Sequence, residues 1–133
     1  MSLPPLQRAP SLTVFYNTLC PICDYGVTWQ ASRLPRDAVQ SGDIAFRDIN
    51  LEPQALSAFN VAIEDIRKRL HALDSDGNLL VGADVAIALW KLTPGHGWVA
   101  TLFGNRLFTP LTRLTYNLFA RVLYAWNRRK GHW

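Results

Sequence analysis

Residues 12–23 read LTVFYNTLCPIC, and this stretch decides the fold. It begins with a short, almost fully apolar run, Leu12–Tyr16, as expected of a central strand that is covered on both faces. It ends in Cys20-Pro21-Ile22-Cys23, which holds both cysteines of the chain. Pro21 suits the first position of a helix, where its missing N–H costs nothing. We therefore expect a strand that leads into a helix whose first turn carries a dithiol.

The helix that follows has its apolar residues on one stripe. Cys23, Val27, Ala31 and Leu34 recur at helical spacing, and a proline then closes the segment. This pattern predicts that Cys23 faces the core and that Cys20 is exposed at the mouth of the helix. The positive end of the helix favours the thiolate of Cys20 there. Two sulfurs at this spacing can close a disulfide with little backbone movement.

Periodicity and turn signals outline the rest of the domain. Asp76-Gly77, between two apolar runs, is a strong hairpin signal, and Asp84 is expected to cap the helix that follows it. In chain order we expect a strand at 44–49, a helix at 53–59, a helical turn at 64–69, strands at 70–73 and 79–81, and a helix at 85–92.

The resulting order, β-α-β-α-β-β-α, is that of an α/β, thioredoxin-like domain, which we assign to residues 12–93. Its first two strands should be parallel and its last two antiparallel. The fold places a C-x-x-C after its first strand, so motif and architecture agree. Residues 1–11 are then an N-terminal tail, and residues 94–133 a helical extension with a basic tail, packed on the same domain.

The extension contains one long amphipathic helix, expected from Pro110 to about Arg129. A face as broad as its apolar stripe is expected to dock on the domain's own core. The alternative is a helix that binds a membrane surface or a partner. The stripe comprises Leu111, Leu114, Leu118, Arg121, Val122 and Ala125, widened by Tyr116, Phe119, Leu123 and Trp126.

Length and composition describe one globular domain. The chain has 133 residues, 49% hydrophobic and 18% charged, which is not the composition of a disordered chain. Neither a basic-then-apolar leader nor an apolar stretch long enough to span a bilayer is recognisable. We therefore expect a cytoplasmic protein without a transmembrane segment. Two cysteines in a reducing compartment favour redox or metal chemistry over a structural disulfide.

The net charge of +4 is unevenly distributed. Residues 1–84 carry all ten acidic residues and seven basic ones, whereas residues 85–133 carry seven basic residues and no acidic one. A solvated helix face with a basic tail accounts for this pattern. It also allows an acidic partner or an anionic surface at the C-terminal helix. No nucleic-acid-binding motif accompanies the charge, so nucleic acid is not expected as a partner.

Metal binding is the other chemistry of a C-x-x-C. A structural zinc site needs four ligands, and the chain has no second cysteine pair. His71, His96 and His132 are scattered along the sequence. We therefore expect neither a metal nor any cofactor beyond the dithiol itself.

Several segments occur in the order of a known family: YNTLCPIC at 16–23, FRDI at 46–49, LHALD with DG at 70–77, and GADVA at 82–86. Together they resemble the DCC-type thiol–disulfide oxidoreductases, which are thioredoxin-like and carry a D-x-x-C-x-x-C signature. Tyr116 and Asn127-Arg128 are similar to the Tyr- and Arg-containing helix that ends the family pattern. The resemblance covers about residues 12–130 and implies a redox-active dithiol.

Two departures from related patterns bear on the site. Asn17 stands where the signature has an aspartate, and an amide can keep similar hydrogen bonds but cannot exchange a proton. Thioredoxins also place a proline just before their third strand, where this chain has the cationic run 67–69. Arg69 at the end of this run could favour acidic substrates or stabilise a thiolate. His71 is expected on the third strand, as a packed residue or as a base near the dithiol.

The expected chemistry is disulfide exchange on a protein disulfide or a small thiol. Cys20 attacks the substrate disulfide, and Cys23 resolves the mixed disulfide. Pro21 and Ile22 set the redox poise by fixing the turn and by lacking charge. The competing interpretation is a non-catalytic thioredoxin-like binding module or redox sensor, which recruits a partner or membrane through its basic C-terminal helix.

Overall fold

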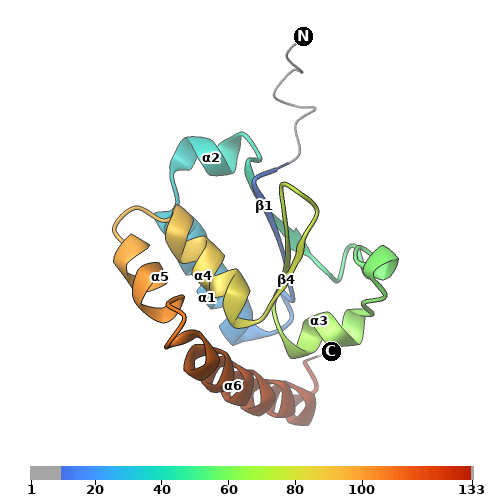
Figure 1. Ribbon diagram of the computed structural model, residues 1–133. Helices are drawn as coiled ribbons and strands as arrows, with labels where there is room; N and C mark the ends of the chain where they lie inside the picture. The colour runs from blue at the N-terminus through green and yellow to red at the C-terminus, as the bar shows by residue number, and fades with distance from the viewer. Residues whose placement is uncertain (1–9, 133) are drawn as a thin grey trace.

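The computed structural model describes residues 10–132, which form a sheet flanked by helices (Figure 1). The strands are β1 (Leu12–Tyr16), β2 (Ile44–Asp48), β3 (His71–Asp74) and β4 (Leu79–Val81), in the order β2-β1-β3-β4. β1 pairs in parallel with β2, and the pairs β1–β3 and β3–β4 are antiparallel. The thioredoxin-like α/β fold predicted from the sequence is confirmed.

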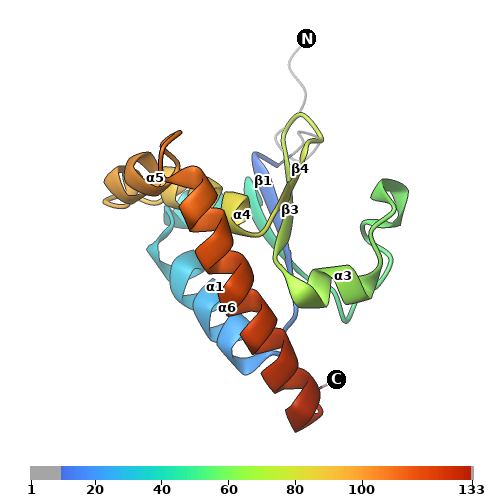
Figure 2. The same cartoon turned by 60° about the horizontal axis from the view of Figure 1, so that its bottom comes forward.

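Helices cover both faces of this sheet. In Figures 1 and 2, α1 and α4 lie on one side of the strands and α3 lies on the other. The α-helices are α1 (Pro21–Arg33), α2 (Arg36–Gln40), α3 (Ile63–Lys68), α4 (Ala83–Leu92), α5 (Gly97–Phe103) and α6 (Thr109–Lys130).

Each face of the sheet has its own apolar core. Val14 and Leu12 of β1 pack with Val85 and Leu89 of α4 in one cluster. Phe15 of the same strand packs in a second cluster, with Ile49, Leu56 and Ile66. Because successive side chains of a strand point to opposite faces, the apolar run of β1 supplies both clusters. The prediction that β1 is covered on both sides is confirmed.

The helix predicted at 53–59 is wrong. Residues 57–59 form only a short 3₁₀ turn, and the residues before them are in turns. In so short a segment, tertiary packing and not helix propensity decides the conformation. Its Leu56 is instead fully buried in the cluster beneath β1, and Asn60 ends the segment in a left-handed conformation.

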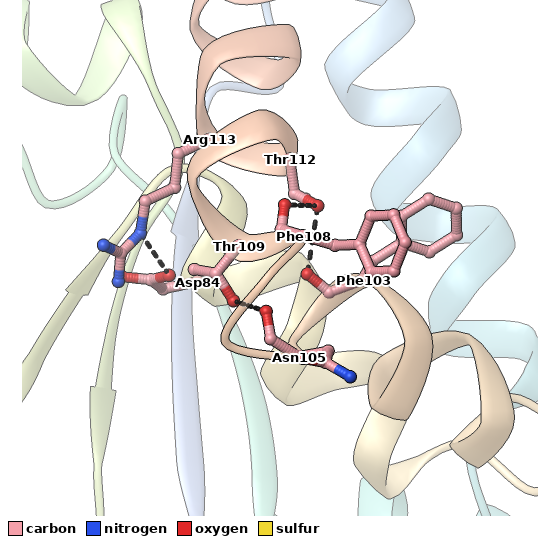
Figure 3. A network of polar contacts seen from close by, with 7 residues as sticks. All are labelled: Asp84, Phe103, Asn105, Phe108, Thr109, Thr112 and Arg113. Atoms are coloured by element: carbon pink, nitrogen blue, oxygen red, sulfur yellow. Dashed lines mark hydrogen bonds and ion pairs between the residues drawn. The ribbon is translucent and has the colours of Figure 1, made fainter.

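The predicted cap of α4 is also wrong. The helix begins two residues earlier than expected, its N-cap position is Gly82, and Asp84 lies within the first turn. The carboxylate of Asp84 pairs with the guanidinium of Arg113 in α6, at 3.2 Å from Nε to Oδ1 (Figure 3). Asp84 therefore connects α4 to α6 instead of capping α4.

Two further helices fill parts of the chain for which we predicted none. α2 follows Pro35, and α5 lies between His96 and Gly104. After α5, the hydroxyl of Thr112 donates to the carbonyl of Phe103, which holds the start of α6 against the end of α5 (Figure 3).

α6 confirms the predicted long helix, but its buried face differs from the predicted one. The leucines at 111, 114 and 118 and Val122 are each more than half exposed. The helix lies against α3 and α4 through the neighbouring stripe, which includes the buried Ala120 and Asn127 and the half-buried Tyr116. The predicted docking face is therefore wrong for these three leucines and Val122, whereas Tyr116, which belonged to the same predicted face, does lie on the docked side.

Within residues 10–132, none of the helices combines the length and the apolar composition that crossing a membrane requires. Most of the predicted tail at 1–11 lies outside the described residues.

Candidate active site

The loop between β1 and α1 is held by a network of short polar side chains. The hydroxyl of Thr18 donates to Asp48 Oδ2 over 2.8 Å. Asn50 Nδ2 donates to Asp48 Oδ1 and to Asn17 Oδ1, both over 2.8 Å. Asn17 Oδ1 also accepts from the backbone N–H of Leu19. These bonds tie the loop to the end of β2 and so fix the backbone that leads into Cys20.

Cys20 occupies the N-cap of α1, with Pro21 in the first turn as predicted. Its Sγ accepts a hydrogen bond from the backbone N–H of Cys23 over 3.2 Å, as an N-cap side chain does. The side chain of Cys23 has the largest effect on the pKa of Cys20, because its hydrogen bond favours the Cys20 thiolate. With the N–H groups of Cys23 and Ile22 and the amide of Asn127, it outweighs burial and lowers the pKa of Cys20 to about 6.

A side chain from α6, that of Asn127, also contacts the sulfur of Cys20. Its Nδ2 donates to Cys20 Sγ over 3.1 Å, and the residue is 1% exposed. Its Oδ1 faces His132 Nδ1, 2.6 Å away, which fixes the orientation of the amide. The sequence indicates Asn127 only as part of the family-like ending. The two residues are 107 positions apart in the sequence, so no local signal indicates this contact.

The predicted exposure of the two cysteines is reversed. Cys20 is 1% exposed, because α6 and Asn127 cover it, while Cys23 is only partly buried. The helical stripe correctly placed Val27 and Leu34 in the core. It could not show that the C-terminal helix lies across the end of α1 that carries Cys20.

The pKa of Cys23 is raised far above that of an ordinary thiol. The hydrogen bond shared with Cys20 is the largest cause, followed by burial and by the negative charge of the Cys20 thiolate. At neutral pH the pair therefore holds one proton on Cys23 and a thiolate on Cys20. This is the protonation state that a nucleophilic thiol and a resolving thiol require.

Cys23 also lines a cavity of about 300 Å³ between α1, α4, α6 and the end of α3. Its wall is mainly apolar, and Asn17, Ile22 and Arg69 take part in it. Three of the supporting residues predicted from the sequence are thus brought together beside Cys23. The cavity itself had no signal in the sequence, because four separate elements form it.

Asn17 is buried, at 3% exposed, and its two amide atoms are in different situations. Oδ1 accepts two hydrogen bonds, from Leu19 and Asn50. Nδ2 has no hydrogen-bond partner among the described residues. Since Oδ1 faces donors, the assignment of the two atoms is fixed by the network. Asn17 therefore keeps the hydrogen bonds available to the signature aspartate and presents a donor where a carboxylate would present an acceptor.

His71 lies on β3 and is buried. This agrees with the first of the two predicted alternatives, a packed strand residue. Its Nδ1 is 2.9 Å from the carbonyl of Arg69, and it is not among the residues that line the cavity. Burial lowers its pKa, so the ring is neutral at pH 7. The structure shows a packed strand residue and no hydrogen bond from His71 to either cysteine within residues 10–132.

A partly buried dithiol at the start of α1, beside a four-stranded mixed sheet, defines the class: a thioredoxin-like domain with a C-x-x-C centre. The sequence model described as DCC1-like thiol-disulfide oxidoreductase matches residues 14–129. The chain belongs to this family, as the resemblance indicated. No match was found among curated proteins or among solved structures.

Proposed function

We propose that the protein is a thiol–disulfide oxidoreductase whose redox centre is the Cys20/Cys23 pair. The observation that supports this most directly is the environment of Cys20. Its sulfur sits at the N-cap of α1 and accepts from the Cys23 N–H and the Asn127 amide, with a pKa of about 6. A thiol in this environment is largely a thiolate at neutral pH, which is the nucleophilic form.

Reduction of a substrate disulfide proceeds in two exchanges. The Cys20 thiolate attacks one substrate sulfur, forming a mixed disulfide and releasing the other substrate sulfur as a thiolate. Cys23 then loses its proton to that thiolate or to water and attacks Cys20 Sγ. The Cys20–Cys23 disulfide forms, and the first substrate sulfur leaves. The substrate gains two electrons and the dithiol loses two, so a thiol reductant must regenerate the enzyme.

Access to Cys20 is part of this mechanism. Because the sulfur is 1% exposed beneath Asn127, a disulfide can approach it only after the last turns of α6 move aside. The Asn127 amide then has two effects: it stabilises the resting thiolate, and it shields that thiolate until a substrate displaces the helix end.

The remaining features of the proposal follow from the same site. The substrate is a protein disulfide or a small disulfide, and no cofactor beyond the dithiol takes part. A cytoplasmic location would supply the thiol reductant that the cycle needs. The basic end of α6 offers a contact for an acidic partner.

Trapping of the mixed disulfide tests the proposal. In Cys23→Ser the resolving thiol is absent, so a substrate attacked by Cys20 stays attached and can be identified by mass spectrometry. Cys20→Ser is the matched control and should capture nothing. If Cys23→Ser captures no substrate disulfide, or captures as much as Cys20→Ser, the proposed reaction is wrong.

One observation favours the alternative of a binding module. The leucines at 111, 114 and 118 and Val122 form an exposed apolar stripe along α6, which suits a helical or membrane partner. If Cys20→Ser retains the biological activity while Leu114→Glu with Leu118→Glu removes it, the binding function is the correct one. Loss through Cys20→Ser alone supports the oxidoreductase.

A further inference from the structure

We infer that the cavity beside Cys23 binds a small organic anion with an apolar body, of the medium-chain carboxylate class. This ligand site goes beyond the proposed disulfide exchange. Three independent features of the cavity lead to it: its apolar wall, the unpartnered donor of Asn17, and the cationic residues at its border.

The wall of the cavity fits an apolar body. Val27 and Gly26 of α1, Leu89 and Trp90 of α4, and Phe119 and Leu123 of α6 contribute to it. The volume of about 300 Å³ is at the lower end of the range for small-molecule sites. The cavity therefore suits a ligand of modest size with a hydrocarbon or aromatic body.

Asn17 supplies a polar group that points to an acceptor. Its Nδ2 is buried, lacks a hydrogen-bond partner among the described residues, and belongs to a side chain that lines the cavity. A buried donor without a partner costs free energy, which a ligand oxygen in the cavity would recover. An aspartate at this position would repel an anionic oxygen. The exchange to asparagine thus changes which ligand this cavity admits.

The charge at the cavity border selects an anion. Lys68 and Arg69 line both this cavity and a second hollow of about 510 Å³, to which Arg121 also contributes. Within the described chain none of these three residues forms an ion pair. The nearby carboxylate of Glu64 is already paired with Arg67, at 3.1 Å. A carboxylate ligand supplies the negative charge that balances these cations. It also supplies an oxygen that can accept a hydrogen bond from Asn17 Nδ2.

The first test measures octanoate binding to the full reduced chain by titration calorimetry. Octanamide, which has the same apolar body without the charge, is the matched ligand. We expect octanoate to bind at least about tenfold more tightly than octanamide. In two-dimensional ¹⁵N NMR, octanoate should shift the side-chain amide of Asn17. The inference would be overturned by equal affinities for the two ligands. It would also be overturned if only the exposed apolar stripe of α6, at residues 111, 114, 118 and 122, showed shifts.

Gly26→Leu provides a variant that fills the cavity without unfolding the chain. A Cβ built at Gly26 meets nothing within 4 Å, and a leucine raises helix propensity, so folding should be retained. We expect octanoate binding to weaken at least about tenfold. Thr28→Leu adds the same side chain to α1 at an exposed position outside the cavity lining, and should leave binding unchanged. Unchanged binding in Gly26→Leu would place the ligand elsewhere.

The charge requirement has its own matched pair. Arg69→Gln should weaken octanoate binding, whereas Arg129→Gln, which removes the same charge from an exposed position at the end of α6, should not. Equal effects would mean that net charge alone attracts the anion, and would contradict a site at this cavity.

Octanoate titrations with Cys20→Ser separate this inference from the proposed reaction. That variant cannot attack a disulfide, but its cavity is intact, so it should still bind octanoate. Binding together with failed trapping would leave the cavity site standing and reject the oxidoreductase. Trapping without octanoate binding would support the oxidoreductase and reject the cavity site.

Discussion

The side-chain amide of Asn127, near the end of α6, donates a hydrogen bond of 3.1 Å to the sulfur of Cys20 at the start of α1. The bond joins residues 107 positions apart and covers the sulfur that the chemistry needs. Figure 2 shows how α6 crosses beside α1 to make this possible.

The first prediction concerns the pH dependence of alkylation by iodoacetamide in the Cys23→Ser variant and in the wild type. Because only the thiolate reacts, the wild-type rate at Cys20 should follow a pKa of about 6, with a plateau above pH 7 and a roughly tenfold loss per pH unit well below 6. In Cys23→Ser the largest cause of the low pKa is weakened, so the midpoint should move upward. A wild-type midpoint near the ordinary thiol value of about 8.5 would contradict the described environment of Cys20.

Asn127→Ala should raise the pKa of Cys20 while opening access to its sulfur. A hydrogen bond to a charged group is worth about 1.5–3 kcal/mol, so an upward shift of about one to two pH units is expected in the same alkylation profile. At pH 9, where both proteins are deprotonated at Cys20, the variant should react faster, because the cover is gone. Asn117→Ala, on the same helix and outside the contact, is the control. A lower midpoint in Asn127→Ala would show that the amide does not stabilise the thiolate.

Asn17→Asp should destabilise the fold in a pH-dependent way. The second carboxylate oxygen would lie where Nδ2 now has no partner, so burial should raise the pKa of the new carboxyl group. Above a pH of about 4 the carboxyl group ionises in the unfolded chain but stays protonated in the folded one. The free energy of unfolding should therefore fall as the pH rises above that value. Urea unfolding should show a loss of about 1–3 kcal/mol at pH 7 and less at pH 4.

The exposed Asn105→Asp exchange is the control for this experiment, because that side chain lies at the surface. It should leave the free energy of unfolding nearly unchanged at both pH values. If Asn17→Asp behaves in the same way as Asn105→Asp, then the amide of Asn17 is not buried without a partner.

Gly82→Ala should lower stability more than Gly95→Ala. Both glycines have positive φ, +66° and +83°, so an alanine is strained at either position by about 1–2 kcal/mol. At Gly82 a Cβ would also lie 3.3 Å from the ring of Tyr116, whereas at Gly95 it meets nothing within 4 Å. The Tyr116 hydroxyl accepts from the Leu70 N–H over 3.1 Å, so the ring has little freedom to move. Thermal unfolding should therefore give a lower Tm for Gly82→Ala, and equal losses would indicate that α6 is not docked there.

Much of the fold was predictable because its signals are local. The apolar run at β1, the proline at the start of α1 and the Asp-Gly turn between β3 and β4 act within a few residues. The turn was predicted correctly: Asp74 Oδ1 accepts from the backbone N–H groups of Asp76 and Asn78. Where local signals were weak, as around Leu56, tertiary burial decided the conformation.

The sequence by itself determined the dithiol, its position at the start of a helix, and the order of the four strands around it. Only the tertiary structure decided which face of α6 is buried, because two apolar stripes of that helix were available. The choice of Ala120 and Asn127 as the inner face buries Cys20, exposes the leucine stripe and encloses the cavity beside Cys23. These features depend on contacts between residues far apart in the chain, and such contacts leave no periodic or local trace in the sequence.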